Sequence, residues 1–199
     1  MKPIICIRTL VTFFLLILVT PVLRAQQSNP NPFTFLISSA LEFGGHSVAD
    51  VSFQDGSVQS MPAGQGGSIY AGGELQLNKK ASFFLRGLIG YKFLTTKATN
   101  ANITLTRVPI RITGVYRPGE KFWVSAGLVT HQAVRFNAGG LGQNASLNSI
   151  LGATVEIGYK MVSLAVTPMT YMETGGSSYD ATGIGLFFHV PLKSKRRNF

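Results

Sequence analysis

Apolar and polar residues alternate along most of the chain after residue 30, and this alternation predicts eight β-strands. Each stretch has one apolar parity, as with Phe35, Ile37, Leu41 and Phe43 in the first. Side chains of a strand alternate between the two faces of a sheet, so each strand has one apolar face. The expected strands are residues 33–45, 67–78, 81–94, 103–117, 121–134, 148–159, 161–172 and 181–192.

The charged residues within these strands lie on the opposite, less apolar parity. Those inside the strands, away from the strand ends, are Glu42, Glu74, Arg86, Lys92, Arg107, Arg111 and Glu156. A charge near the midplane of a bilayer costs roughly 2–4 kcal/mol for Lys or Arg, so a lipid-facing position is unfavourable for this set. Burial inside a closed sheet is tolerable if acids and bases pair. We therefore expect these seven side chains to form a charge network in a lumen.

The connections between the expected strands alternate in length. The short turns are residues 78–80, 117–120 and 160, and the longer loops are residues 46–66, 95–102, 135–147 and 173–180. Short periplasmic turns and long outer loops are typical of bacterial outer-membrane barrels. The sequence thus predicts an all-β fold, an eight-stranded antiparallel up-and-down transmembrane β-barrel. We expect a small hairpin within the first long loop, formed by residues 48–53 and 57–61 around Asp55-Gly56.

Residues 1–25 have the pattern of a secretory signal peptide. Lys2 and Arg8 give a positive start, residues 9–23 form an apolar run, and Ala25 is a small residue suited to cleavage. The run is about fifteen residues, shorter than the roughly 20 that a retained spanning helix needs. The expected organisation is a signal peptide at 1–25, an outer-membrane β-barrel at 26–192 and a basic C-terminal tail at 193–199.

The composition shows an excess of positive charge, and the chain expected after cleavage has no cysteine. The sequence has 18 Lys and Arg against 8 Asp and Glu, and its single Cys lies in the signal segment. Cleavage would remove three basic residues and leave a net charge of +7. An exported protein rarely meets nucleic acid, so solvent or anionic lipid headgroups are the expected surroundings of the basic tail.

A soluble two-sheet sandwich is the alternative fold, because it would also bury apolar faces against each other. The regular loop alternation favours the barrel, and so do strands long enough for the 9–11 residues of a tilted crossing. Aromatic residues near strand ends agree with girdles at the two water–lipid boundaries. They are Phe33, Phe43, Tyr91, Phe93, Tyr116, Phe122, Tyr159 and Tyr171, of which Tyr171 has the inward parity.

Five short motifs support a narrower resemblance. They are Gly44-Gly45-His46, Phe53-Gln54-Asp55-Gly56-Ser57, Ala63-Gly64-Gln65-Gly66, Gly90-Tyr91 and Arg107-Val108-Pro109. The chain resembles the small eight-stranded outer-membrane barrels of Gram-negative bacteria, which include the membrane domain of outer membrane protein A. The motifs look like those of an uncharacterised proteobacterial barrel group, in which an acid often follows the Gly-Gly pair where this chain has His46. The resemblance implies lumen salt bridges, surrounding lipid and lipopolysaccharide, and the barrel-assembly machinery as partner, but no activity.

Candidate catalytic and metal-binding residues are few. The histidines are His46, His131 and His189. In barrel enzymes that deacylate lipid A, a Ser would follow His131 by two residues, where this chain has Ala133. Asp50 and Asp55 are two acids without a third for calcium. We therefore expect no enzyme activity, no cofactor and no metal.

The expected function is that of an integral outer-membrane protein, expected as a monomer, with a structural or surface-interaction role. An eight-stranded barrel is filled by side chains. The side chains expected to fill it are Phe84, Arg86, Arg111, Trp123 and Phe187. Recognition would fall on the outer loops, chiefly residues 46–66. A narrow pore for small solutes and a lipid A-modifying enzyme are the alternatives.

Overall fold

The computed structural model describes residues 32–52, 56, 58–78, 82–98, 101–140, 143–173 and 176–192. The regular structure within these ranges is entirely β. None of the described residues belongs to a helix long and apolar enough to span a membrane. The predicted signal peptide at 1–25 and the predicted tail at 193–199 lie outside the described residues.

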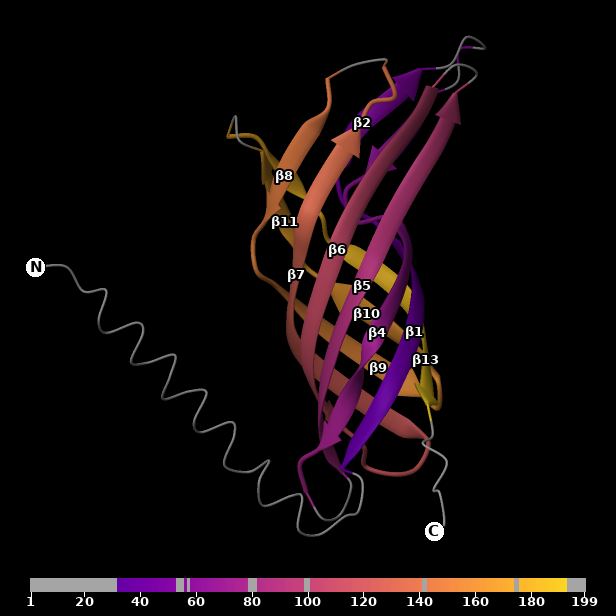
Figure 1. Cartoon of the computed structure of the whole chain (residues 1–199), viewed down its shortest axis with the longest axis vertical. Helices are drawn as coiled ribbons and strands as arrows, with labels where there is room; N and C mark the ends of the chain where they lie inside the picture. Colours follow the sequence, from indigo (N-terminus) through magenta and orange to yellow (C-terminus); the bar gives the residue numbers. More distant parts are fainter. Residues whose placement is uncertain are drawn as a thin grey trace, which may run out of the picture.

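Antiparallel pairing closes the sheet on itself (Figure 1). Among the described residues eight strands form the ring, in the spatial order β1 (Phe33–Phe43), β4 (Gly66–Gln76), β5 (Phe83–Ala98), β6 (Ala101–Tyr116), β7 (Phe122–Asn137), β9 (Gly152–Tyr159), β10 (Val162–Thr167) and β13 (Gly183–Leu192). β13 then pairs with β1, so the ring has no unpaired edge. The predicted eight-stranded up-and-down barrel is confirmed.

On the side of the long loops, several strands continue beyond the ring. β5 and β6 pair as far as Ala98 and Ala101, so the predicted loop at 95–102 is wrong and most of it is strand. The predicted strands at 148–159 and 161–172 are each interrupted, and their outer parts are β8 (Ala145–Ser149) and β11 (Thr170–Glu173). A short β12 (Ser178–Asp180) pairs with β11.

The first long loop contains the predicted hairpin, β2 (Ser47–Ser52) and β3 (Val58–Pro62). Its second strand leads into the barrel, because Met61 and Ala63 have no exposed surface. The loop therefore returns its chain to the mouth of the ring before β4 begins.

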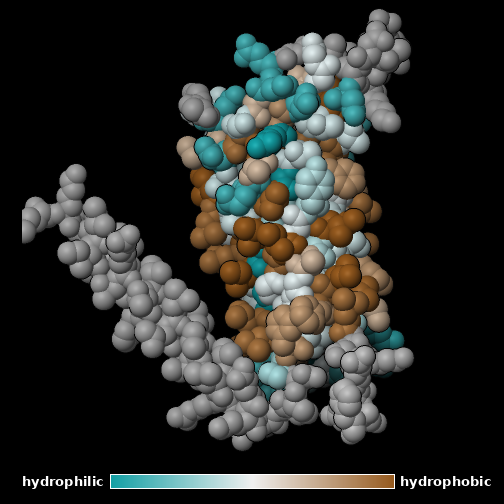
Figure 2. Space-filling view, viewed as in Figure 1, coloured by the Kyte–Doolittle hydropathy of each residue, from teal (hydrophilic) through white to brown (hydrophobic). Residues whose placement is uncertain are grey.

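The outer wall of the ring is a continuous apolar belt. On the face that Figure 2 shows, hydrophobic residues predominate below a more hydrophilic outer end. The side chains of the belt are exposed although they are large, as with Phe35 at 62%, Val155 at 62% and Ile157 at 58%. Along β5 the belt runs from Phe83 to Phe93, about 33 Å of strand at ~3.3 Å per residue. A tilt of about 40° reduces this to roughly 25 Å, the height of the apolar band of outer-membrane barrels.

Aromatic rings mark the short-turn boundary of this belt. Phe83 packs on Tyr116 with ring centroids 4.8 Å apart, and Phe122 packs on Tyr159 at 4.9 Å. All four are exposed on the outer wall. They form the kind of girdle that aromatic side chains make at a water–lipid interface. Tyr171 is fully buried inside, as its parity predicts.

Beyond the belt, on the long-loop side, apolar side chains face into the barrel instead of outward. The same face of β6 that carries Arg107 and Arg111 into the lumen carries buried Ile103 and Leu105 further out. The buried cluster there consists of Met61, Ala63, Ile103, Leu105, Val129, Val134, Leu147, Met169, Tyr171 and Ala181. A sheet in water must turn its apolar residues inward, so this outer head is built like a soluble domain.

A β-bulge produces this inward orientation in β7. The register with β6 shifts between Thr106 and Val108, opposite Ala133, which has a positive φ of 49°. The extra residue reverses the parity of the strand. His131 and Val134 consequently both face inward, three positions apart. In the sequence pattern, Val134 has the parity of the lipid-facing residues. Because of the bulge it faces inward instead, so the pattern does not hold beyond Ala133.

Candidate functional site

The seven charged residues expected in a lumen are all buried inside the barrel. Their exposed fractions range from 0% for Arg107 to 3% for Glu42, Glu74 and Arg111. They separate into two groups along the barrel axis. One group is centred on Glu74 and Glu156, and the other on Glu42 and Lys92.

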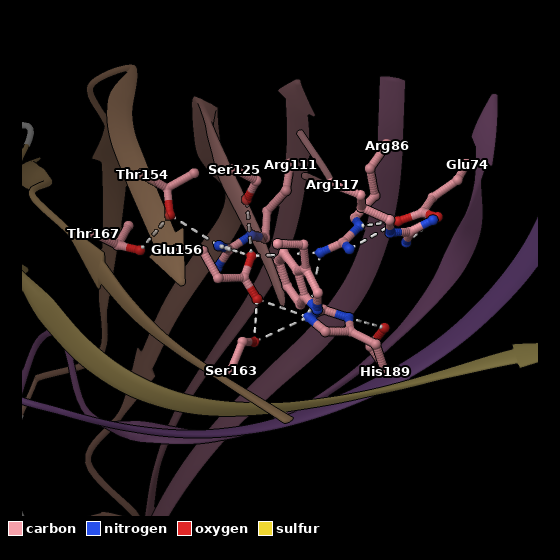
Figure 3. A network of polar contacts seen from close by, with 12 residues as sticks. Glu74, Arg86, Arg111, Arg117, Ser125, Thr154, Glu156, Ser163, Thr167 and His189 are labelled. Atoms are coloured by element: carbon pink, nitrogen blue, oxygen red, sulfur yellow. Dashed lines mark hydrogen bonds and ion pairs between the residues drawn. The ribbon is translucent and has the colours of Figure 1, made fainter. Parts of the chain in front are cut away.

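Arg86 is the centre of the first group (Figure 3). Its guanidinium lies 2.8 Å from Glu74 Oε1 and 3.5 Å from Glu156 Oε2. Arg111 Nη2 lies 3.8 Å from the same Glu156 oxygen and donates a 2.8 Å hydrogen bond to Thr154. A buried carboxylate is tolerated when several charge-assisted donors surround it, and both carboxylates here meet that condition.

Arg117 also joins this group, although it lies where the expected strand 103–117 ends and the expected turn 117–120 begins. Its Nη2 lies 2.6 Å from Glu74 Oε2, and its side chain is 30% exposed. Arg117 has the same parity as Arg107 and Arg111 on β6. That parity is the signal by which the sequence could have included it.

His189 is the second missed member, and it links three strands (Figure 3). Its Nε2 lies 2.7 Å from Glu156 Oε1, and its Nδ1 lies 2.7 Å from Ser38 Oγ. Ser, His and Glu in this order resemble a hydrolase triad, but Ser38 is only 1% exposed and does not line the hollow that reaches His189. The chain of bonds instead ties β1 to β13 and β9. His189 is on the inward parity of its strand, which is the signal for it.

Aromatic rings cover the three guanidinium groups. Arg86 stacks at 4.3 Å from the Trp123 ring centroid, Arg111 at 4.4 Å from Phe187, and Arg117 at 4.3 Å from Phe84. Stacking on an aromatic face favours a cation that has been removed from water.

Trp123 needs Gly158 to take this position. A Cβ at Gly158 would lie 2.1 Å from the Trp123 ring, so only glycine leaves room for the indole to cross the lumen. The indole Nε1 donates to the Lys160 carbonyl at 3.0 Å. Trp123 and Phe84 thus line a hollow that opens toward the short turns.

The second group holds a segment of the first loop inside the barrel mouth. Residues 61–66, called here the plug segment, lie next to Lys92 and Arg107. Lys92 Nζ lies 2.9 Å from Glu42 Oε2 and donates to the Gly64 carbonyl at 2.7 Å. Arg107 donates to the carbonyls of Ala63 and Gln65, and none of the described carboxylates is within ion-pair distance of it. Arg107 thus binds backbone oxygens, not the acid that charge pairing led us to expect.

Three of the motifs that carried the resemblance meet at this plug segment. Gly64 N donates to the Gly44 carbonyl at 3.0 Å, and Ala63 N donates to the His46 carbonyl at 2.8 Å. A Cβ at Gly45, where φ is 85°, would lie 2.6 Å from Gly64 N. Glycine is therefore required where these backbones cross. His46 stands where the related motifs often have an acid. It takes part in this crossing through its backbone carbonyl.

His131 and Tyr171 lie directly behind the plug segment. His131 Nδ1 is hydrogen-bonded to the Tyr171 hydroxyl, which also accepts a 3.3 Å bond from Arg107. His131 is 5% exposed and faces the inside of the barrel. It is therefore screened from the lipid-facing wall, where the substrate of a lipid A deacylase would lie.

The two ends of the lumen differ. On the long-loop side, the plug segment and the apolar cluster fill the mouth. On the short-turn side, a hollow of about 820 Å³ extends inward from residues 117–120 to Trp123 and His189. The lumen is therefore a pocket that opens toward the short turns.

The described residues contain no group of three or more His, Cys, Asp or Glu that could hold a metal ion. Asp50 accepts a 2.9 Å hydrogen bond from Ser47 in the hairpin. Hydrogen bonds from Ser60 and Ser47 hold the pKa of Asp50 below its usual value. Asp55 lies outside the described residues.

No protein-family model matches the chain, and no curated protein matches it. Among solved structures, Ail, the attachment invasion locus protein of Yersinia pestis, crystallised with the heparin analogue sucrose octasulfate, has a TM-score of 0.45 and 10% identity. The match covers 79% of this chain and 97% of that chain. The assignment of this chain as a small eight-stranded barrel rests on its own strand pairing and not on this likeness.

Proposed function

We propose that the protein is an integral outer-membrane barrel that holds a rigid head at the cell surface, in a structural or surface-interaction role. One observation carries the proposal. On the single strand β6, Ile112 is 56% exposed within the belt, whereas Leu105 is fully buried beyond it. Hydrocarbon around the ring and water around the head account for both placements.

The filled outer mouth supports a barrel that passes little solute. The plug segment is bound by Lys92 and Arg107 and packs in the apolar cluster through Met61 and Ala63. The hollow of about 820 Å³ favours the narrow pore as the second candidate, because it opens part of the lumen toward the short turns.

The inward position of His131 supports a protein that is not an enzyme. Chemistry on a membrane lipid needs a base and a nucleophile that reach the lipid-facing wall. Both His131 and His189 are instead hydrogen-bonded inside the barrel.

The test combines fractionation, gel mobility and conductance. We expect the chain in the outer-membrane fraction, a shift in gel mobility on boiling, and no steady single-channel steps in planar bilayers. A chain that stays dissolved in the periplasm or medium would refute the membrane proposal. Steady steps from the unaltered protein would leave the membrane placement intact and replace the plugged barrel by the pore.

A further inference from the structure

The turn between β9 and β10 holds Lys160 in a backbone conformation that lysine rarely adopts. Its φ is 53°, in the left-handed region where Gly or Asn would be accommodated more easily. Three bonds fix this turn: Lys160 N donates to the Lys121 carbonyl at 2.7 Å, Trp123 Nε1 donates to the Lys160 carbonyl, and His189 N donates to the Met161 carbonyl at 2.8 Å. Strain that the surroundings impose on a residue is a pointer to a function of its side chain.

The Lys160 ammonium lies on the membrane side of the wall. Its Nζ is 5.7 Å from the ring centroid of Tyr159, which faces outward and is 44% exposed. Tyr159 belongs to the aromatic girdle with Phe122. Lys121, exposed and hydrogen-bonded through its backbone to Lys160, adds a second positive charge at this boundary.

Next to Lys160 the belt is hollowed into an apolar groove. The hollow measures about 640 Å³ and is lined by Ile157, Val162, Leu164 and Leu186 among others. A second hollow, of about 420 Å³, shares Val162 and Leu186 with the first and reaches Gly67 and Phe93. The two hollows adjoin at these shared residues and are together called the groove here; Lys160 lines one of them.

We propose that this groove binds one anionic phospholipid, with its phosphate at Lys160 and Lys121 and an acyl chain along the groove. The inference rests on the membrane placement of the proposed function. The positive end of the groove is complementary to an anionic headgroup. A Lys ammonium is a compact partner for phosphate, and Lys next to a membrane attracts anionic headgroups. The apolar lining of the rest of the groove suits hydrocarbon.

The experiment compares two lipids on the folded protein by native mass spectrometry. The protein is released from detergent micelles that contain equal amounts of phosphatidylglycerol and phosphatidylethanolamine with the same acyl chains. We expect the unaltered protein to retain phosphatidylglycerol preferentially. Lys160→Asn should reduce that preference about fivefold, because it removes one ammonium near the membrane surface.

Two further variants make the test specific. Asn tolerates the left-handed conformation, so Lys160→Asn should fold at least as well as the parent protein. Val162→Trp fills the junction of the two hollows and should reduce retention of both lipids. Arg135→Asn removes an exposed charge at the outer head and should change the retention of neither lipid.

Equal retention of both lipids by the unaltered protein, or an unchanged preference in Lys160→Asn, would overturn the lipid site. The heat-induced gel shift is measured on each variant to separate this outcome from a failure of the barrel proposal. Absence of the shift in the unaltered protein would refute the membrane barrel itself. If Lys160→Asn alone lacks the shift, Lys160→Gly replaces it, since glycine is unstrained at this φ.

Discussion

At the residue scale, the barrel keeps its buried charges by surrounding each carboxylate with more than one donor. Glu74 has Arg86 and Arg117, and Glu156 has Arg86, Arg111 and His189. Parity in the sequence indicates which charges share a face. The choice of partner depends on which strands the closed ring brings opposite one another, and Arg86 reaches Glu156 only because β5 and β9 face each other across the lumen.

Replacing Arg86 by Met should destabilise the barrel by about 3–5 kcal/mol, because two buried carboxylates lose their shared cation. The Trp123 ring also loses the group stacked on it. The measurement is urea unfolding in detergent, followed by tryptophan fluorescence. Arg135→Met, at an exposed position, is the control and should change the free energy of unfolding by less than about 0.5 kcal/mol. Equal effects of the two substitutions would contradict an ion-paired interior.

Asp180, in the outer head, gives a prediction about pH. Hydrogen bonds from the Thr182 hydroxyl and then its backbone N–H, the latter at 2.9 Å, hold the pKa of this carboxyl below its usual value, and His46 adds to the effect. Because the folded pKa is lower than the unfolded value of about 3.9, the stabilisation is complete above that value. It is lost as the pH falls through the folded pKa.

Hydrogen exchange of the Thr182 amide checks this expectation. Its protection factor should fall below about pH 4 in the unaltered protein. In Asp180→Asn, which retains an acceptor oxygen but does not titrate, the protection factor should be independent of pH over the same range. A pH dependence that is the same in both proteins would assign the effect to another group.

At the element scale, a single strand serves two environments. In β6 the inward residues include Arg107 and Arg111 within the belt, whereas beyond it they are Ile103 and Leu105, and in β7 the bulge at Ala133 reverses the parity. The sequence pattern of β6 predicts the belt from Val108, Ile110 and Ile112. It does not predict that Ile103 and Leu105 belong to a buried core, because their partners come from loops distant in sequence.

Truncation of two residues of β6 measures this difference. Leu105→Ala should cost about 2–5 kcal/mol, because it leaves a cavity in the packed head. Ile112→Ala removes a lipid-facing side chain whose place mobile detergent or lipid can fill, so the loss should be much smaller. Both are measured by urea unfolding in the same detergent. A larger loss for Ile112→Ala would indicate that the belt, and not the head, is the packed core.

At the scale of the whole molecule, the barrel is asymmetric along its axis. One end is a water-facing head with the plug segment inside it, the middle is a ring with charges inside and hydrocarbon side chains outside, and the other end opens as a hollow toward the short turns. This sequence of environments defines an orientation across a bilayer.

An arginine scan of the outer wall tests that orientation. Val155, midway along the belt portion of β9 and 62% exposed, should tolerate Arg poorly, with a loss of roughly 2–4 kcal/mol. Gln59 is also exposed but lies on β3 in the hairpin of the first loop, outside the ring, so Gln59→Arg should be neutral within about 0.5 kcal/mol. Unfolding from lipid bilayers measures both. A Val155→Arg protein as stable as Gln59→Arg would place water, not hydrocarbon, around the ring.

The sequence by itself determined the strands of the ring, the parity that separates apolar from charged residues within the belt, and the short turns at residues 117–120 and 160. These properties are local, since strand periodicity and turn composition act within about ten residues. Only the tertiary structure decided the rest: the partners of Glu74 and Glu156, the entry of the plug segment, and the burial of Leu105 and Val134 in the head. Those contacts depend on the register of the closed ring and on one bulge, which join residues far apart in the chain.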